Sequence, residues 1–373
     1  MDTRVVKVDV EKPEPGIIAE AARVIDEGGL VGFPTETVYG VACRVRDDSL
    51  GRLNNLKGRT PDKYYTLHIG GKDVLGRYVR SLNLRAEKLV RKAWPGPLTI
   101  VFELSAADMK KQRSELEDEV FRNLYRDNSI GVRCPDDAVA ARLLTAAKEA
   151  VVAPSANLTG QEPAVEAGEV LERFNGLVDL VLDGGKCRYG KSSTVVKIGR
   201  NGLQMLREGV YTAEEILKMA ELVFLFVCTG NTCRSPMAAG LFTRHLAEKV
   251  GYSVDELEEK GYKIVSAGTM GAVGWPATAE AVKASANRGV DISGHRSSGL
   301  SAELIEGADY VFVMTQAHRQ MVLGLSSEGR DERVRLLGEE EIPDPIGQGQ
   351  EVYDKCAEMI DKAVQNRIYE VLK

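Results

Sequence analysis

A short loop at residues 227–235 constrains the fold of this chain more than any other feature. It reads V-C-T-G-N-T-C-R-S, so that Cys228 and Arg234 stand near its two ends. An apolar run typical of a buried strand comes directly before the loop, and Pro236, which suits the first turn of a helix, comes directly after it. The pattern predicts a strand, a tight loop and a helix, with Ser235 as the N-cap of that helix.

The composition of this loop suits the capture of a phosphoryl group by a cysteine. Backbone N–H groups in front of a helix N-terminus bind anions, and the planar guanidinium of Arg234 can hold two phosphoryl oxygens. The same helix terminus favours the thiolate of Cys228. We therefore expect Cys228 to act as a nucleophile in a phosphate-binding loop whose other members are Thr229, Gly230, Asn231, Thr232, Cys233 and Ser235.

The loop closely resembles that of the low molecular weight protein tyrosine phosphatases, in which it reads C-x-G-N-x-C-R-S-P-M-A. Similar words follow in the same order at residues 266–268, 295–297 and 309–315. The resemblance implies a flavodoxin-like α/β domain with a parallel sheet at residues 221–373. It also implies that Asp344, which lies between two prolines, is the general acid.

The mechanism implied by this resemblance is a two-step transfer that needs no metal or other cofactor in this half of the chain. Cys228 takes the phosphoryl group from a phosphorylated protein while Asp344 donates a proton to the leaving group. Water then hydrolyses the thiophosphate ester with Asp344 as the base, and Arg234 binds the phosphoryl oxygens throughout. Arsenate reduction, another chemistry of this fold, is less favoured, because beyond the loop only Cys356 could supply the resolving thiol.

The preferred phosphoamino acid depends on the lining of the loop. Thr229 resembles the residue of the protein arginine phosphatases, whereas the tyrosine enzymes usually carry a larger aliphatic residue there. Residues 345–347 also lack the adjacent tyrosines that line the phosphotyrosine slot of many relatives. Phosphoarginine is therefore favoured, and phosphotyrosine stays an alternative. Cys233 has two interpretations, a reversible disulfide with Cys228 or packing beneath the loop.

The remainder of the chain is long enough for a second domain. With 373 residues, 43% of them hydrophobic, the chain can form two full cores. Acidic side chains exceed basic ones after residue 220 but not before it, and a short helical pattern capped by Thr212 ends there. We expect one domain at 1–212 and another at 221–373. No signal pattern opens the chain, no apolar run approaches the ~18 residues of a membrane helix, and the six cysteines form no disulfide or zinc framework, so a cytoplasmic protein without membrane association is expected.

Residues 1–212 alternate between helical patterns and apolar runs of strand length. Helices are expected at 17–25 and 50–56, each followed by glycine. Strands are expected at 30–33, 98–104, 129–133, 151–153, 178–182 and 194–198. This alternation is typical of an α/β domain. Basic side chains outnumber acidic ones between residues 51 and 100, but no Walker or dinucleotide motif is present, so any nucleotide site must be of another kind.

Several sequence words in this half occur in a characteristic order. They include F-P-T-E-T-V-Y-G at 33–40, K-x-R at 57–59, W-P-G-P-L-T at 94–99 and A-P-S-A-N at 153–157. Together they closely resemble the YrdC-type threonylcarbamoyl-AMP synthases, from residue 5 to about residue 212. The resemblance implies a twisted mixed α/β domain that joins L-threonine, bicarbonate and ATP into threonylcarbamoyl-adenylate and pyrophosphate.

The same resemblance implies the residues of the site. Those on the ATP side are Lys57, Arg59, Ser155, Asn157 and Arg207, and those on the threonine side are Thr35, His68, Arg133 and Ser193. Mg²⁺ would accompany ATP and bridge its phosphates. The product would serve a transferase complex that modifies transfer RNA.

Some positions depart from the pattern of this family. Tyr64 and Tyr65 stand where Pro-Leu is common, Ser192 where Glu is common, and Glu208 within a word that usually reads R-P-G. Two alternatives remain for the chain as a whole. The first half could be a non-catalytic RNA-binding module, or the second half a regulatory pseudoenzyme; the intact sets of site residues argue against both.

Overall fold

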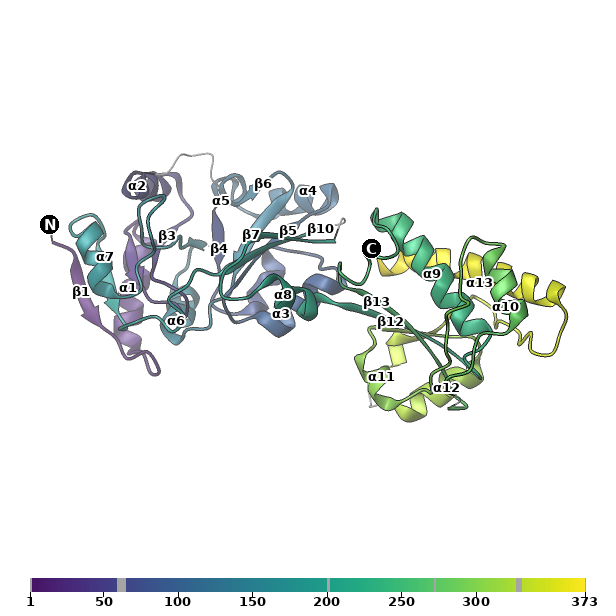
Figure 1. Cartoon of the computed structure of the whole chain (residues 1–373). Coiled ribbons are helices and arrows are strands. Elements are labelled where there is room, and N and C mark those ends of the chain that lie inside the picture. The colour runs from purple at the N-terminus through teal and green to yellow at the C-terminus, as the bar shows by residue number, and fades with distance from the viewer. Residues whose placement is uncertain (1, 59–64, 200–201, 272, 327–330, 373) are drawn as a thin grey trace. The chain divides into compact units, whose positions relative to one another are not determined.

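The computed structural model describes residues 2–58, 65–199, 202–271, 273–326 and 331–372. It divides the chain into two compact units, Met1–Ala220 and Glu221–Lys373. Figure 1 colours the first unit from purple to teal and the second from green to yellow. No helix within the described ranges is long and apolar enough to cross a membrane.

The first unit is built on one mixed sheet. Its strands follow the order β1-β9-β2-β3-β8-β4-β7-β5-β10-β11, and β6 pairs with β7. Some neighbours are parallel, such as β4 and β7, and others antiparallel, such as β5 and β7. The strands are β1 (Arg4–Lys7), β2 (Val31–Phe33), β3 (Gly40–Arg44), β4 (Thr66–His68), β5 (Leu98–Glu103), β6 (Tyr125–Arg126), β7 (Ser129–Arg133), β8 (Val151–Val152), β9 (Leu180–Asp183), β10 (Thr194–Gly199) and β11 (Gly202–Arg207).

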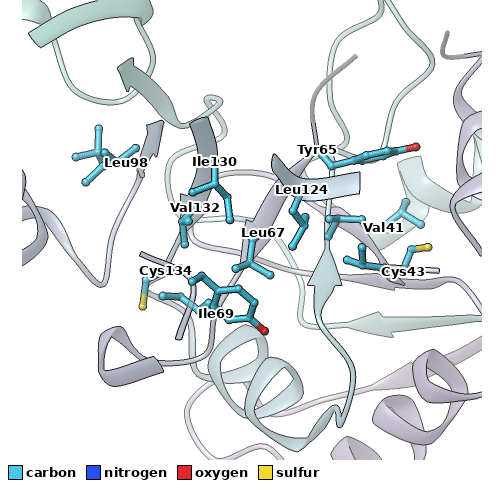
Figure 2. Packing of buried hydrophobic residues seen from close by; sticks show 14 of the residues in the cluster. Val41, Cys43, Tyr65, Leu67, Ile69, Leu98, Leu124, Ile130, Val132 and Cys134 are labelled. Atoms are coloured by element: carbon cyan, nitrogen blue, oxygen red, sulfur yellow. The ribbon is translucent and has the colours of Figure 1, made fainter. Parts of the chain in front are cut away.

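Apolar side chains are buried on both faces of this sheet, because successive residues of a strand point to opposite sides. Val41 of β3 belongs to one buried cluster, and the next residue, Ala42, belongs to another. Figure 2 shows part of the first cluster, including Val41, Leu67 and Val132. The helices that supply the clusters and the connections are α1 (Pro15–Asp26), α2 (Asp47–Lys57), α3 (Leu84–Ala93), α4 (Ala106–Glu115), α5 (Asp118–Leu124), α6 (Ala138–Ala146), α7 (Ala167–Phe174) and α8 (Ala213–Ala220), with a 3₁₀ helix at Lys72–Arg77.

The second unit has a four-stranded parallel sheet in the order β13-β12-β14-β15. Its strands are β12 (Leu222–Cys228), β13 (Tyr262–Gly268), β14 (Tyr310–Val313) and β15 (Val334–Leu336). The first strand in sequence lies between the second and the third, so the order reverses at β12. In open parallel sheets the crevice for ligands lies outside the carboxyl ends of the strands at such a reversal. The expected flavodoxin-like architecture is confirmed.

Helices cover both faces of this second sheet. Phe224 and Phe226 pack against Phe242 of α9 on one face, whereas Leu225 and Val227 belong to the apolar cluster on the other. The helices are α9 (Arg234–Val250), α10 (Ala279–Ala286), α11 (Ala302–Gly307), α12 (Gln316–Leu325) and α13 (Gln350–Val371), with a 3₁₀ helix at Asp331–Arg333.

The expected long elements are confirmed, with shifts of a few residues at their ends. The predicted strand 129–133 is β7, and the predicted helix at 50–56 is the greater part of α2, which ends before Gly58 at a left-handed φ of 56°. Thr212 caps α8 as expected, since its hydroxyl accepts from the N–H of Glu215 while the Glu215 carboxylate accepts from the N–H of Thr212. The sequence did not predict β1, β3, β4, β6 or β11. Of these, β4 and β6 have only three and two residues, β1 and β11 lie at the edges of the sheet, and β3 begins at the last residue of the F-P-T-E-T-V-Y-G word.

Candidate active sites

A cavity of about 290 Å³ lies in the first unit, at one end of the central strands. Every site residue predicted from the sequence for this unit lies on its wall, apart from Arg59, which is outside the described residues together with Tyr64. The predicted residues that line the cavity are Thr35, Lys57, His68, Arg133, Ser155, Asn157, Ser193 and Arg207. The fold thus brings together residues that are separated by up to 172 positions in the sequence.

Lys57 connects helix α2 to the turn that follows strand β8. Its ammonium donates to the carbonyl oxygen of Asn157 at 2.7 Å and to that of Ser155. The side-chain amide of Asn157 in turn donates to the carbonyls of Leu158 and Gln161, both at 2.8 Å. The buried ammonium is therefore fixed at the cavity wall, next to the hydroxyl and amide groups of the turn.

Arg133 forms a buried cluster with the threonines of the F-P-T-E-T word. Its Nη2 atom lies 3.0 Å from Oε1 of Glu36 and 2.6 Å from Oγ1 of Thr37, and it also reaches Thr35 at 3.4 Å. The side chains of Arg133 and Glu36 are only 8% and 1% exposed. Sequence reasoning missed Glu36, although a carboxylate between two threonines after an apolar strand was the available signal.

His68 is neutral in this cavity. Burial, and then the positive charge of Arg133, lowers the pKa of His68 to about 3. Nδ1 lies 3.0 Å from the carbonyl oxygen of Thr66, so Nδ1 carries the proton and Nε2 has a free lone pair. The imidazole therefore offers a hydrogen-bond acceptor rather than a positive charge.

Arg207 and Ser193 form the opposite part of the wall. The Arg207 guanidinium donates to the carbonyl oxygen of Ser193 at 2.8 Å and to its hydroxyl at 3.2 Å, and that hydroxyl lies 3.1 Å from Oγ1 of Thr99. Burial, and then the nearby Arg133, lowers the pKa of Arg207 below its ordinary value. Tyr65, one of the departures from the family pattern, also lines the cavity, with its hydroxyl 2.5 Å from Oδ1 of Asn54.

The walls of this cavity combine positive charges with neutral hydroxyl and amide groups. Lys57, Arg133 and Arg207 supply the charges, which suits a polyanion and a carboxylate held close together. The described residues include no group of three or more His, Cys, Asp or Glu side chains that could hold a metal ion.

The second unit has a smaller cavity of about 130 Å³ around the C-x5-R loop. Cys228 ends β12, and Arg234 begins α9, so residues 228–235, which we call the phosphate cradle, connect the strand to the helix. Gly268 makes this possible, because a Cβ atom there would stand 2.8 Å from the carbonyl oxygen of Thr229 and 3.0 Å from the N atom of Asn231. The S-A-G word at 266–268 thus lies directly against the cradle.

Asn231 holds the cradle from within. It adopts a left-handed φ of 55°, and its side chain is fully buried. Nδ2 donates to the hydroxyls of Ser235 at 2.8 Å and Ser266 at 2.9 Å, while Oδ1 accepts from the N–H of Ser298 at 2.8 Å. Every polar atom of this amide is used to fix the turn, which explains why asparagine stands at this position of the loop.

The predicted role of Ser235 as an N-cap is wrong. Helix α9 begins at Arg234, one residue before Ser235, and Cys233 occupies the cap position without a side-chain capping bond. The Ser235 hydroxyl is buried and lies 3.0 Å from Sγ of Cys228. The tight cradle brings the helix N-terminus closer to the strand than a simple strand-loop-helix pattern implies, and the serine contacts the sulfur instead of the helix amides.

Arg234 and Asp344 both line the small cavity and are in contact with each other. The Arg234 guanidinium contacts the Asp344 carboxylate, and it donates to the carbonyl oxygen of Ile342 at 3.1 Å and to Oγ1 of Thr229 at 3.2 Å. Its Nε atom is buried and has no partner among the described residues. The backbone N–H groups of 230–233 likewise donate to no residue that the structure describes. These donors surround the cavity next to the cysteine and can bind an anion.

The other two thiols of this unit, those of Cys233 and Cys356, have hydrogen-bond partners other than Ser235. Sγ of Cys233 lies 3.4 Å from the hydroxyl of Tyr353 and 3.6 Å from Oγ1 of Thr278. Cys356 is buried, and burial raises its pKa to about 12, which disfavours the thiolate that a resolving cysteine needs. In this structure both thiols are free.

His318 of α12 is a polar residue at the cradle that the sequence did not indicate. Its Nε2 atom lies 2.9 Å from Oγ1 of Thr229, although 89 positions separate the two residues. Burial, and then the charge of Arg234, lowers the pKa of His318 below its ordinary value. A single histidine in a helix with mixed apolar and polar residues gives no sequence signal of such a contact.

Comparison with known proteins agrees with the division into two units. A family model described as telomere recombination, for the Sua5, YciO and YrdC proteins, matches residues 23–209, and one described as low molecular weight phosphotyrosine protein phosphatase matches residues 223–373. The threonylcarbamoyl-AMP synthase of Pyrococcus abyssi is 31% identical over 272 residues, which are 68% of this chain and 77% of that protein. The low molecular weight protein-tyrosine-phosphatase Etp of Escherichia coli K12 is 34% identical over 153 residues, 39% of this chain and 95% of that protein.

Solved structures support the assignment of the first unit. A double-alanine variant of Pyrococcus abyssi Sua5 is similar with a TM-score of 0.50 and 29% identity, over 60% of this chain and 71% of that chain. Together with the cradle geometry and the composition of the larger cavity, these matches assign each unit. The chain belongs to the Sua5/YciO/YrdC family through residues 23–209 and to the low molecular weight phosphotyrosine protein phosphatase family through residues 223–373.

Proposed function

We propose that the first unit synthesises L-threonylcarbamoyladenylate from L-threonine, bicarbonate and ATP. The observation that carries this proposal is the single cavity in which Lys57, Arg133 and Arg207 stand beside the hydroxyls of Thr35, Ser155 and Ser193. A triphosphate and an amino acid carboxylate both need positive charge, and the acceptors of the cavity suit the threonine amine and hydroxyl. The related proteins from Pyrococcus abyssi and Bacillus subtilis carry the name threonylcarbamoyl-AMP synthase.

The family resemblance and the shared cavity support the following roles for the side chains. Lys57 and Arg207 neutralise the ATP phosphates, and Ser155 and Asn157 contact the nucleotide. Arg133 holds the carboxylate of the substrate threonine. Nε2 of neutral His68 accepts a hydrogen bond from the same substrate. The threonine amine attacks the carbon of bicarbonate, one C–O bond breaks and water leaves, which gives the carbamate. A carbamate oxygen then attacks the α-phosphorus, and the bond from that phosphorus to pyrophosphate breaks.

Mg²⁺ enters this proposal as a companion of ATP. The described residues contain no dedicated cluster of metal ligands, so the ion would be bound chiefly by the phosphates, as is usual for Mg²⁺ with nucleotides. Arg59 belongs to the proposed ATP-side residues by its place in the K-x-R word. The product would be consumed by a transferase that modifies transfer RNA in the cytoplasm.

The test is an assay of pyrophosphate release from ATP by the full-length protein. Release should require both threonine and bicarbonate, and the Lys57→Ala variant should lose it. The matched control is Cys228→Ser, which changes the other unit and should leave the release unaffected. Pyrophosphate release that does not depend on threonine would contradict the proposal.

We propose that the second unit is a cysteine-dependent protein phosphatase. The observation that carries this proposal is the cavity that unites Cys228, Arg234 and Asp344, with unpartnered donors around it. In the first step the Cys228 sulfur forms a bond to phosphorus, and the bond to the leaving group breaks as Asp344 transfers a proton to it. In the second step water attacks the thiophosphate, Asp344 takes a proton from that water, and the Cys228 thiolate is released, assisted by the Ser235 hydroxyl at 3.0 Å.

The substrate proposed for this phosphatase is phosphoarginine in a protein, in preference to phosphotyrosine. The cavity is small, and two threonines of the cradle, Thr229 and Thr232, line it. Exposed apolar side chains of Met270 and Ile346 stand at its rim, and they can contact the flexible methylenes of an arginine. The ratio of kcat/KM for a phosphoarginine peptide to that for a phosphotyrosine peptide of the same sequence tests this preference, and a ratio below one would contradict it.

The alternative is that one unit is a non-catalytic module, either for RNA binding or for regulation. No observation of the two cavities favours it, since each carries its full described set of proposed residues. The two assays above decide between the alternatives, because a non-catalytic unit would be silent in its own assay while the other remains active.

A further inference from the structure

Three polar side chains, one of them from the phosphate cradle, form a continuous chain of hydrogen bonds. Nε2 of His318 lies 2.9 Å from Oγ1 of Thr229, and Nδ1 lies 2.9 Å from Oγ1 of Thr315. Thr315 is the N-cap of α12, and its Oγ1 atom also accepts from the backbone N–H of His318 at 3.3 Å. We call these residues the threonine–histidine–threonine chain. Its outer end is fixed by the start of a helix, and its inner end lies at the cradle.

The surroundings of the imidazole in the middle of this chain favour its neutral form. It is only 5% exposed, and burial together with the charge of Arg234 lowers its pKa, against the weaker opposite effects of Asp344 and Glu341. A neutral imidazole has one N–H group and one lone pair. Its two contacts must therefore differ, with a donor at one nitrogen and an acceptor at the other.

The pairing of protons in the chain selects one of the two tautomers. If Nδ1 carried the proton, Oγ1 of Thr315 would accept from both the backbone N–H and the ring N–H of His318, and the Thr315 proton would have to be given to solvent, to which Thr315 is partly exposed. With the proton on Nε2, Thr315 donates to Nδ1 and His318 donates to Thr229. This second arrangement pairs the hydroxyl proton of Thr315 and the ring proton of His318 within the protein, without solvent, and we take it as the arrangement of the chain.

The favoured tautomer determines what the Thr229 hydroxyl can do. Its oxygen accepts from His318 and also from Nη2 of Arg234, which is a donor only. Both lone pairs of the hydroxyl are then used, and its own proton cannot point to either of these neighbours. Thr229 lines the cavity together with Cys228 and Arg234. The remaining direction for the proton is toward the cavity.

We propose that His318 is a positioning residue that turns the proton of the Thr229 hydroxyl toward the phosphoryl oxygens of a bound substrate. The inference rests on the proposed phosphatase activity of this unit. The oriented Thr229 hydroxyl adds one hydrogen-bond donor to those from the cradle backbone and Arg234. Such a donor acts on the charge that develops on phosphoryl oxygens, so we expect it to affect kcat more than KM, and to do so for P–N and P–O substrates alike.

Paired substitutions in the full-length protein test this role with p-nitrophenyl phosphate as the substrate. His318→Leu removes the donor, whereas His318→Gln places an amide N–H near the position of Nε2. Thr229→Val removes the hydroxyl, and Thr229→Ser retains it. We expect the first member of each pair to lower kcat by about tenfold or more with KM nearly unchanged, and the second member to stay within about threefold of the unmodified protein.

A double substitution and a remote control separate positioning from general damage. His318→Leu combined with Thr229→Val should be no slower than Thr229→Val alone, because both changes remove the same donor. His245→Gln is the control, since His245 pairs with Asp361 on α13 and is not among the residues that line the cavity. Full activity of His318→Leu, or losses that multiply in the double variant, would overturn the inference.

The tautomer itself is measurable without any activity. In the full-length protein labelled with ¹⁵N-histidine, the signal that disappears in His318→Gln belongs to His318, and its two nitrogen shifts report which nitrogen carries the proton. We expect the Nε2–H form, and the Nδ1–H form would overturn the inference. A phosphatase assay that is silent in the unmodified protein would instead contradict the proposed function, so the two failures are distinguishable.

Discussion

Arg133 and Glu36 form an ion pair of 3.0 Å in the wall of the larger cavity, and both side chains are almost completely buried. The second carboxylate oxygen of Glu36 and the Nε atom of Arg133 have no partner among the described residues. A buried pair of this kind contributes little net stability, but the loss of one partner leaves an uncompensated charge. The pair holds the Arg133 guanidinium at the wall of the cavity, where the proposed threonine carboxylate binds.

Glu36→Ala should therefore damage both stability and activity of the first unit. We expect a loss of about 3 to 5 kcal/mol in the free energy of unfolding, because the Arg133 charge stays buried without a partner. Urea unfolding of the full-length protein measures the loss, and pyrophosphate release measures the activity. Glu36→Gln, which retains a hydrogen-bonding oxygen, should lose less of both. Equal stability of Glu36→Ala and the unmodified protein would show that the pair is absent in solution.

The raised pKa of Asp137 makes the free energy of unfolding of the first unit depend on pH. Burial is the main cause that raises its pKa to about 6, against the backbone hydrogen bond at the start of α6. The folded state thus binds this proton more tightly than the unfolded chain, whose carboxyl titrates near pH 4. Its contribution is fully present below about pH 4 and is lost as the pH rises through 6.

Asp137→Asn keeps the capping oxygen and removes the titration. Relative to the unmodified protein, this variant should gain about 1 to 2 kcal/mol of stability at pH 8 and gain little at pH 4, allowing for solvent screening of a half-buried group. Urea unfolding of both proteins at the two pH values gives the difference. A difference that does not grow with pH would exclude Asp137 as its cause.

Gly268→Ala should disrupt the phosphatase without affecting the synthase. The added Cβ would meet three backbone atoms of the cradle at 2.8 to 3.0 Å, so the cradle has to shift. We expect phosphate release to fall by at least about tenfold, since small displacements of catalytic groups have large effects on rate. Gly294→Ala is the matched control, because nothing lies within 4 Å of the added atom there. Normal phosphate release from Gly268→Ala would contradict the observed packing of β13 against the cradle.

Asp344→Asn tests the general acid through the leaving group. The variant should lose about 100-fold or more in kcat for phosphotyrosine, whose leaving oxygen needs a proton. It should lose much less for p-nitrophenyl phosphate, whose leaving group is stable as an anion. The two values of kcat, measured under saturating substrate, give the comparison. Equal losses for both substrates would point to a binding role for Asp344 in place of proton transfer.

The parts of the fold that follow from local patterns were predictable from the sequence. The apolar run at β12 and the glycine after α2 mark an element or its end by themselves, and both are confirmed. The short strands β4 and β6 are defined by hydrogen bonds to distant partners, so three or two residues carry too little periodicity to reveal them. The start of α9 was misplaced because the cradle, rather than Ser235, determines where the helix begins.

The candidate sites were predictable only where a sequence word contained the residue. Lys57 and Ser155 stand in such words, and the fold places both on one cavity. Glu36 stood inside a word, but its pairing with Arg133 is a contact across 97 positions. His318 belongs to none of the sequence motifs. Its contact with Thr229 depends on how α12 packs beside β14, and no local sequence pattern reveals that packing.

The central claim is that one chain carries two separate catalytic centres. The most direct measurement is a paired assay on the full-length protein, with pyrophosphate release from ATP in the presence of threonine and bicarbonate, and phosphate release from a phosphorylated peptide. Lys57→Ala should abolish only the first activity, and Cys228→Ser only the second. Loss of both activities in either variant, or silence of the unmodified protein in either assay, would contradict the claim.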